Sequence, residues 1–315
     1  MTKRAPHRPL AITGVSGYVG QHLLRHVAQD SGRPVVGVDI NAPLFAPPQM
    51  KFYSIDIRQG YLREVFERER VETVVHLAFV LRPGFDVGLM HEFNVEGSRN
   101  VLEAAAAGGA KKVLVMSSTA VYGANPDNPP ALAEDTPLRG HPGFPYVRDQ
   151  IAVERLAIEF GATHPDIEVV ILRPCIIYGR RTRSFLLDFF RRMPVLPMPG
   201  GANPPLQFIH VDDAVRALQL SLAKGRGAYN VIGRGTISYA EVAHMLRKRT
   251  VYVPRAVAYT TLDLLGMTRL VEGLPPYILD FVTYPWVADG GKAERELGFR
   301  AKFSSREALE SMLNN

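Results

Sequence analysis

The sequence is poor in the residues that build disulfides and metal sites. Its 315 residues include one cysteine, Cys175, so an internal disulfide is excluded, and the lack of clustered cysteine and histidine argues against a structural zinc site. Cys175 falls in an apolar stretch, where a small buried side chain is a simpler interpretation than a reactive thiol. We therefore expect a reducing compartment, the cytoplasm, and no metal ion in the functional site.

Long hydrophobic runs are missing as well. No stretch approaches the roughly 18 apolar residues of a membrane-spanning helix, and the basic start, Met1 to Arg8, lacks the apolar core of a signal peptide. Charged residues make up 22% of the chain, which is ordinary for a soluble protein. The net charge of +6 is scattered along the sequence, so we expect neither nucleic acid nor a membrane among the partners.

The most informative pattern is a glycine-rich turn near the start of the chain. A short buried-strand pattern, Leu10 to Ile12, leads into Thr13-Gly14-Val15-Ser16-Gly17-Tyr18-Val19-Gly20. The glycines allow a tight turn and a close approach of the backbone to a pyrophosphate, and the first amides of the following helix then face the phosphates. The next strand ends at Asp39, where a carboxylate can bond the ribose hydroxyls. This context favours dinucleotide binding, although a purely structural strand–turn–helix would carry similar glycines.

Strand and helix patterns alternate through the first half of the chain. This alternation predicts an α/β fold with a Rossmann-type doubly wound parallel sheet. The expected strands are Leu10 to Ile12, Val35 to Val38, Lys51 to Ile55, Thr73 to Leu77, Lys112 to Met116 and Glu168 to Leu172. We expect a Rossmann domain over residues 8–175, rejoined by 207–232. A smaller substrate-binding lobe would then comprise residues 176–206 and 233–315.

Further landmarks follow the glycine turn in a characteristic order. They are Asp39, Asp56-Ile57, His76-Leu77-Ala78, Asn94-Val95-Glu96-Gly97, Val115 to Gly123, Tyr146, Arg173-Pro174 with Tyr178-Gly179, Phe208 to Asp213, and Leu297-Gly298-Phe299. With this ordered set the sequence resembles the extended short-chain dehydrogenase/reductases, the NAD-dependent epimerase/dehydratase group, along nearly its whole length. The resemblance implies a small-molecule substrate and a homodimer formed through segments 88–107 and 146–160.

The resemblance also implies which residues hold the cofactor. Asp39 indicates NAD and not NADP, because a carboxylate would repel a ribose phosphate and no arginine directly follows it. Two of the implied residues have other interpretations, Asp56 as a turn former at a strand end and Asn94 as a helix cap. The implied cofactor-binding set is Gly14, Gly17, Tyr18, Val19, Asp39, Ile40, Asp56, Ile57, Leu77, Ala78, Asn94, Tyr146, Gln150 and Pro174.

For catalysis the resemblance implies Ser118 and Tyr146, a hydroxyl and a phenol that face the reacting oxygen. Hydride transfer at carbon must be matched by a proton on oxygen, which a phenol can supply or accept. The family's lysine is expected four residues after the tyrosine, where this chain has Gln150. A tyrosine with the ordinary pKa of about 10 needs roughly 3 units, or about 4 kcal/mol, to act as a base near pH 7. The neutral amide of Gln150 cannot supply that electrostatically, so activity is expected to be weakened.

Two departures concern the substrate. Ile176 stands where nucleotide-sugar enzymes of the family often have asparagine, and Leu206 stands where an arginine usually grips the phosphates. The cluster Arg180 to Arg183 follows the Tyr-Gly turn and is either a site for a carboxylate or phosphate or an exposed loop. The resemblance places Thr119, Ile176 and Arg183 near the substrate.

Three functions are compatible with these patterns. The leading hypothesis is an NAD-dependent oxidoreductase or epimerase of the extended short-chain dehydrogenase type, acting on a hydroxyl or carbonyl of a small, partly apolar substrate. The first alternative is an NAD-binding regulatory or scaffold protein with little or no turnover. The second alternative is a nucleotide-sugar 4-epimerase.

Overall fold

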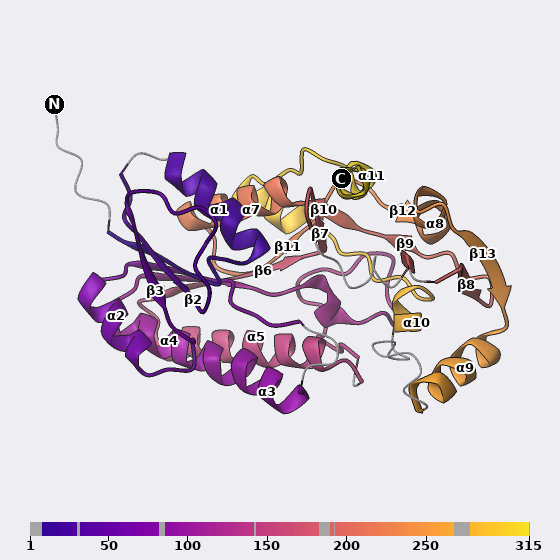
Figure 1. Ribbon diagram of the computed structural model, residues 1–315, viewed down its shortest axis with the longest axis horizontal. Helices are drawn as coiled ribbons and strands as arrows, with labels where there is room; N and C mark the ends of the chain where they lie inside the picture. The colour runs from indigo at the N-terminus through magenta and orange to yellow at the C-terminus, as the bar shows by residue number, and fades with distance from the viewer. Residues whose placement is uncertain are drawn as a thin grey trace.

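The computed structural model describes residues 8–29, 32–81, 86–141, 143–182, 190–191, 193–267 and 278–314, with side chains left out at 262–267. Its larger half has three layers (Figure 1). Helices α1 (Tyr18–Gln29) and α7 (Val211–Ala223) cover one face of a central sheet, and α2 (Tyr61–Glu69), α4 (Gly97–Ala107) and α5 (Pro145–Thr163) cover the other. This architecture confirms the predicted α/β Rossmann-type fold.

The central sheet has seven strands, all parallel, in the order β11-β6-β5-β4-β1-β2-β3. The strand order reverses beside β1, which places the glycine-rich turn at the switch point where ligands bind in such sheets. The last strand to join follows α7 and pairs with β6, so the chain returns to the sheet there. The strands are β1 (Leu10–Thr13), β2 (Val35–Asp39), β3 (Met50–Ser54), β4 (Thr73–His76), β5 (Lys112–Met116), β6 (Glu168–Pro174) and β11 (Gly227–Val231).

Of the six expected strands, the one over Lys112–Met116 has the predicted bounds, and the other five differ by one or two residues at an end. β1 and β2 end one residue later than expected, and β3 and β4 end one residue earlier. β3 begins one residue early, at Met50, because its pairing with β2 starts at Val35 opposite Met50. β6 runs two residues further than expected, to Pro174, because β11 continues to pair with it there. The longer β6 carries Arg173 and Pro174 to the edge of the sheet where the functional side chains gather.

The smaller half is built from short elements with their own apolar core. Three two-stranded sheets pair β10 with β7, β12 with β9 and β13 with β8. The core contains the side chains of Tyr178, Phe208, Tyr239, Val242 and Leu309. The elements are β7 (Ile176–Tyr178), β8 (Val195–Pro199), β9 (Pro205–Leu206), β10 (Phe208–His210), β12 (Ile237–Ser238), α8 (Tyr239–Met245), β13 (Arg249–Val253), α9 (Arg255–Met267), α10 (Ile278–Phe281) and α11 (Ser305–Leu313).

One segment of the expected small lobe packs elsewhere. The π-helical turn η3 (Ala293–Leu297) and the following Phe299 belong to the core that Leu218 and Tyr229 form on the Rossmann sheet. This corrects the placement of these residues, because their apolar side chains are buried against α7 and β11 although the chain reaches them after the lobe. The division into two domains otherwise stays a prediction.

Three structural observations concern the cysteine, membrane-spanning helices and metal-binding side chains. Cys175 is 2% exposed, and burial raises the pKa of its thiol to about 12, so it is the small buried side chain that was expected. In the part of the chain that the structure describes, no helix has the length and apolarity needed to cross a bilayer. The same residues include no group of three or more histidine, cysteine, aspartate or glutamate side chains with metal-binding geometry.

Candidate functional site

The glycine-rich turn is shaped by contacts that leave no room for side chains. Gly14 has a φ of +70°, and a Cβ atom there would lie 2.6 Å from the amide nitrogen of Ala78. A Cβ at Gly20 would meet the carbonyl oxygen of Gly14. The turn therefore packs directly on the segment that follows β4, and α1 starts at Tyr18 with its first amides free for an anion.

Asp39 lies at the end of β2, beside this turn. One carboxylate oxygen accepts the amide N–H of Ser16 at 3.0 Å, and the other accepts that of Asn41 at 3.1 Å. Each oxygen keeps a lone pair for a further donor. The neighbouring Ile40 is 58% exposed and flanks the carboxylate. The turn and Asp39 thus present the free amides and the carboxylate that the phosphates and ribose of a dinucleotide require, so these residues fit NAD.

Asp56 and Asn94 had two interpretations each. The carboxylate of Asp56 accepts hydrogen bonds from the guanidinium and the amide of Arg58, which lower its pKa. It therefore forms a turn at the end of β3, and its cofactor contact stays a prediction. Asn94 is fully buried inside the π-helical turn η1 (Glu92–Glu96), so it does not cap a helix. Its side chain bonds both backbone groups of Val80 and the carboxylate of Asp149, which ties the loop after β4 to α5.

The two proposed catalytic side chains meet beside Gln150. The side-chain amide of Gln150 donates to the Tyr146 hydroxyl at 3.3 Å, one helical turn away on α5. Ser118 begins the short 3₁₀ turn η2 (Thr119–Tyr122), where its oxygen accepts the N–H of Ala120. Burial raises the pKa of Tyr146, and hydrogen bonds with Gln150 and Ser118 lower it only in part. The phenol is therefore held in its protonated form.

Gln150 has one further property that concerns the cofactor. Its side chain is buried, and its Oε1 atom has no hydrogen-bond partner among the described residues. A buried amide oxygen without a partner is costly unless a ligand satisfies it. A ribose hydroxyl is a suitable donor, so the orphaned oxygen also fits a bound dinucleotide.

A buried polar network lies behind these groups, and the sequence analysis missed it. Ser117 donates to the carboxylate of Glu154, one turn beyond Gln150 on α5. Arg173 makes a bidentate ion pair with Glu154, from Nε to Oε1 at 3.1 Å and from Nη2 to Oε2 at 2.7 Å, and donates to the Tyr122 hydroxyl at 2.8 Å. The network joins α5, the end of β5 and the end of β6. The available signal was the spacing of Glu154, which repeats the helical period of Tyr146 and Gln150.

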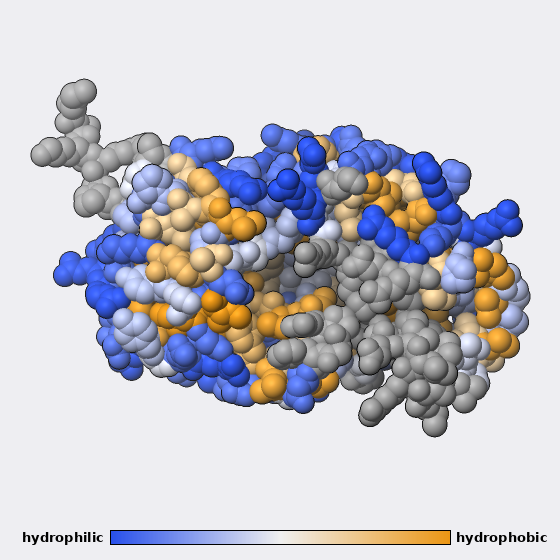
Figure 2. All heavy atoms as spheres, in the orientation of Figure 1, coloured by the Kyte–Doolittle hydropathy of each residue, from blue (hydrophilic) through white to orange (hydrophobic). Residues whose placement is uncertain are grey.

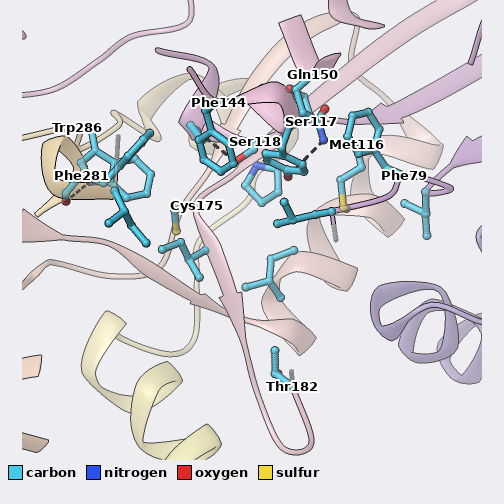
Figure 3. A pocket seen from close by; sticks show the side chains of 18 residues that line it. Phe79, Met116, Ser117, Ser118, Phe144, Gln150, Cys175, Thr182, Phe281 and Trp286 are labelled. Atoms are coloured by element: carbon cyan, nitrogen blue, oxygen red, sulfur yellow. Dashed lines mark hydrogen bonds between the residues drawn. The ribbon is translucent and has the colours of Figure 1, made fainter. Parts of the chain in front are cut away.

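Ser118 and Tyr146 line a cavity of about 380 Å³. Figure 3 shows Trp286 and Phe281 on one side of it, Phe79 and Met116 on the other, and Ser118 between them. The face drawn in Figure 2 has a hollow bordered by hydrophobic residues. None of the described lining residues is charged; they are Leu77, Phe79, Leu81, Met116, Ser117, Ser118, Ala120, Phe144, Tyr146, Gln150, Pro174, Cys175, Ile176, Ile177, Thr182, Ile278, Phe281 and Trp286.

Of the residues expected near the substrate, one lines the cavity and another does not. Ile176 lines the cavity. Thr119 does not: its side chain is 1% exposed, and its hydroxyl has no hydrogen-bond partner among the described residues. Arg183 lies outside the described residues. Of the remaining basic cluster, the backbone carbonyl of Arg180 accepts a hydrogen bond from the Tyr18 hydroxyl at 3.2 Å, which joins the glycine-rich turn to the segment after β7.

Of the residues expected to contact the cofactor, some line the cavity and others pack among apolar side chains. Leu77 and Pro174 line the cavity together with Gln150. Ile57 is buried at 2% exposure, and its side chain closes the space beside Gly97. Val19 is partly buried and packs on the apolar core beneath α1.

Comparisons with known proteins agree with this geometry. The model of the NAD dependent epimerase/dehydratase family matches residues 10–232. UDP-glucose 4-epimerase 4 of Oryza sativa subsp. japonica is 31% identical over 286 residues, which cover 76% of this chain and 76% of that protein. The dTDP-glucose 4,6-dehydratase of Streptomyces griseus is 28% identical over 263 residues, covering 75% and 77%. A structure of MoeE5 in complex with UDP-glucuronic acid and NAD is 26% identical, covers 97% of this chain and 98% of that chain, and superposes with a TM-score of 0.75. These matches confirm NAD as the expected cofactor and an enzyme of epimerase/dehydratase type.

Proposed function

Because the chain belongs to the NAD-dependent epimerase/dehydratase family, we propose that it is an oxidoreductase or epimerase acting on a hydroxyl or carbonyl of a small, partly apolar substrate. The observation that carries this proposal is the meeting of Ser118, Tyr146 and Gln150 at a cavity whose other described lining residues are mostly apolar. A reacting oxygen placed there would face two hydroxyl groups and otherwise hydrocarbon.

The proposed mechanism divides the work among these side chains. Bound NAD supplies the group that accepts or returns a hydride. The Ser118 hydroxyl, whose oxygen accepts the N–H of Ala120, would turn its proton from Tyr146 to the substrate oxygen and polarise it. The Tyr146 hydroxyl exchanges a proton with the same oxygen. The glycine-rich turn, Asp39 and the orphaned oxygen of Gln150 would hold the cofactor.

We further propose that turnover is slow at neutral pH. Two arginines on the elements that form the site are already paired: Arg148 with Asp149 at 3.2 Å and Arg173 with Glu154 at 2.7 Å. Burial raises the pKa of Tyr146, so a phenolate would form without a neighbouring positive side chain. Proton exchange at Tyr146 is therefore expected to limit the rate.

A nucleotide-sugar 4-epimerase is the second candidate, and similarity to a UDP-glucose 4-epimerase favours it. Two observations count against it. Leu206, at the position of the family's phosphate-gripping arginine, is buried in the small lobe's core. The next side chain, Gln207, bonds both backbone groups of Ala288, is buried and carries no positive charge for a phosphate.

The test measures NADH formation by the purified protein with NAD and neutral secondary alcohols. In parallel it measures conversion of UDP-glucose to its 4-epimer, because epimerisation returns the hydride to the sugar and leaves no net NADH. We expect slow reduction with an alcohol and at least a hundredfold loss in Tyr146→Phe, since a positioned acid or base contributes about 10² to 10⁴ in rate. Unchanged turnover in Tyr146→Phe would disprove the proton role. NAD binding without turnover of any substrate would favour the regulatory alternative.

The assembly and location are also proposed. A homodimer would use the segments 88–107 and 146–160, which include the exposed apolar side chains of Leu89 and Ile158. Light scattering after size-exclusion chromatography tests it, and Ile158→Glu should shift the mass to that of a monomer. The proposed location is the cytoplasm, because a single cysteine suits a reducing compartment.

A further inference from the structure

We propose, on the basis of the proposed function, that the substrate carries an uncharged aromatic ring as a substituent of its reacting carbon. This ring would pack against the side chains of Phe144, Phe281 and Trp286. We refer to these three side chains as the aromatic wall. All three line the cavity that also contains Ser118 and Tyr146.

The aromatic wall starts at the catalytic phenol and is continuous. The ring of Phe144 lies 5.6 Å from that of Tyr146, centroid to centroid. Phe144 contacts Phe281 at 6.0 Å and 82° between planes, and Phe281 contacts Trp286 at 5.0 Å and 88°. Figure 3 shows the wall extending away from Ser118 toward Trp286. A substituent on the reacting carbon that points in this direction meets these ring surfaces and no charged side chain among the described lining residues.

The wall offers no hydrogen bond to a polar substituent. Its single N–H, on the indole of Trp286, donates to the backbone carbonyl of Phe281 at 3.2 Å. Phe281 and Trp286 are each 7% exposed, so a group seated against them leaves water. Desolvating a sugar hydroxyl or a phosphate without a partner is unfavourable, whereas an uncharged ring gains from the same burial.

The geometry favours an aromatic ring over an aliphatic one. The wall's contacts between Phe144, Phe281 and Trp286 are close to edge-to-face, the arrangement that aromatic quadrupoles prefer. A further aromatic ring can extend this series, whereas a saturated ring contributes only its apolar area. The cavity volume of about 380 Å³ is at the small end of ligand sites, and the expected cofactor contacts Leu77, Gln150 and Pro174 line part of it, so the substrate portion suits no more than one ring and its carbinol.

Trp286 supplies a direct probe of this site because it is the only tryptophan in the chain. We would titrate the full-length protein, saturated with NAD, with 1-phenylethanol, 1-cyclohexylethanol and UDP-glucose while recording tryptophan fluorescence. We expect saturable quenching by 1-phenylethanol with a Kd about threefold to tenfold lower than that for 1-cyclohexylethanol, the factor that corresponds to one aromatic pair. UDP-glucose should give no saturable change.

Variants locate the contact. Phe144→Leu should remove the preference for the phenyl compound and leave the Kd of 1-cyclohexylethanol within about twofold. Phe303→Leu is the matched control, because that ring packs on His210 and does not line the cavity. It should leave both Kd values unchanged.

Several results would overturn the inference: saturable binding of UDP-glucose without binding of 1-phenylethanol, equal or tighter binding of the cyclohexyl compound, or an equal loss in Phe303→Leu. The comparison of the two alcohols uses the unaltered protein and does not depend on any variant folding. If 1-phenylethanol binds as expected but no alcohol yields NADH, the proposed turnover fails and the inference stands. If NADH forms from other alcohols and 1-phenylethanol does not bind, only the inference fails.

Discussion

Replacing Gln150 with lysine tests how the site controls the proton on Tyr146. In the native protein the amide of Gln150 lies 3.3 Å from the phenol oxygen, and burial raises the pKa of Tyr146 above its ordinary value. An ammonium group about 4 Å from that oxygen would favour the phenolate by about 4 kcal/mol at an effective dielectric constant near 20. This corresponds to a pKa about 3 units lower.

Part of that gain is lost because the lysine must be buried where Gln150 is now 3% exposed. We therefore expect the pKa of Tyr146 to fall by at least 1 unit, and the oxidation rate at pH 7 to rise by at least about tenfold. The sign follows from the charge: a cation stabilises the deprotonated form of a phenol, so Tyr146 should titrate at lower pH in Gln150→Lys.

The assay needs no substrate. The phenolate absorbance of Tyr146 is obtained as the difference between spectrophotometric pH titrations with and without Tyr146→Phe, which subtracts the other eleven of the twelve tyrosines. The matched control is Gln150→Met, which keeps the length and apolar volume of the side chain but adds no charge. Superimposable titrations of Gln150→Lys and the native protein, with NAD still bound, would refute the electrostatic reasoning.

Three further predictions concern cofactor affinity and stability. Asp39→Asn removes a charge at nearly constant side-chain size. Calorimetry should show NAD binding at least about tenfold more weakly, because hydrogen bonds to charged groups contribute about 1.5 to 3 kcal/mol. An unchanged Kd would contradict the assigned role of Asp39. Glu154→Gln leaves the guanidinium of Arg173 unpaired in the interior, so urea unfolding should show a loss of about 3 to 5 kcal/mol, and overlapping unfolding curves would disprove this. Burial lowers the pKa of His76 to about 4 in the folded protein, whereas its pKa in the unfolded chain is about 6.5. Between these two pH values the unfolded chain binds a proton that the folded protein does not bind. The free energy of unfolding should therefore fall by about 2 kcal/mol from pH 7 to pH 5, and His76→Gln should flatten that slope.

The parts of the site that depend on local chain geometry were predictable. The tight turn at Gly14 follows from a strand, a glycine and a helix in immediate succession, and the φ of +70° there is one that glycine adopts without strain. Tyr146 and Gln150 share a helix face because they are four residues apart, and the structure shows the resulting hydrogen bond. Local spacing predicts such features since it fixes which backbone and side-chain groups can meet.

Contacts between distant segments were not predictable in the same way. The pairing of Glu154 with Arg173 depends on where β6 ends in the sheet. The hydrogen bonds between the Gln207 side chain and the Ala288 backbone join residues 81 positions apart. Thr119 follows Ser118 in the sequence, yet it is excluded from the cavity because η2 turns its side chain into the interior.

By itself, the sequence determined the Rossmann fold, the NAD-type turn with Asp39, and the replacement of a charged side chain by Gln150. These follow from residue type and short-range periodicity. Only the tertiary structure decided what surrounds the reacting oxygen, because Phe281 and Trp286 come from a segment more than 130 residues beyond Tyr146. Their burial against Phe144 is a result of packing between the two halves of the chain, and packing of that range leaves no periodic pattern in the sequence.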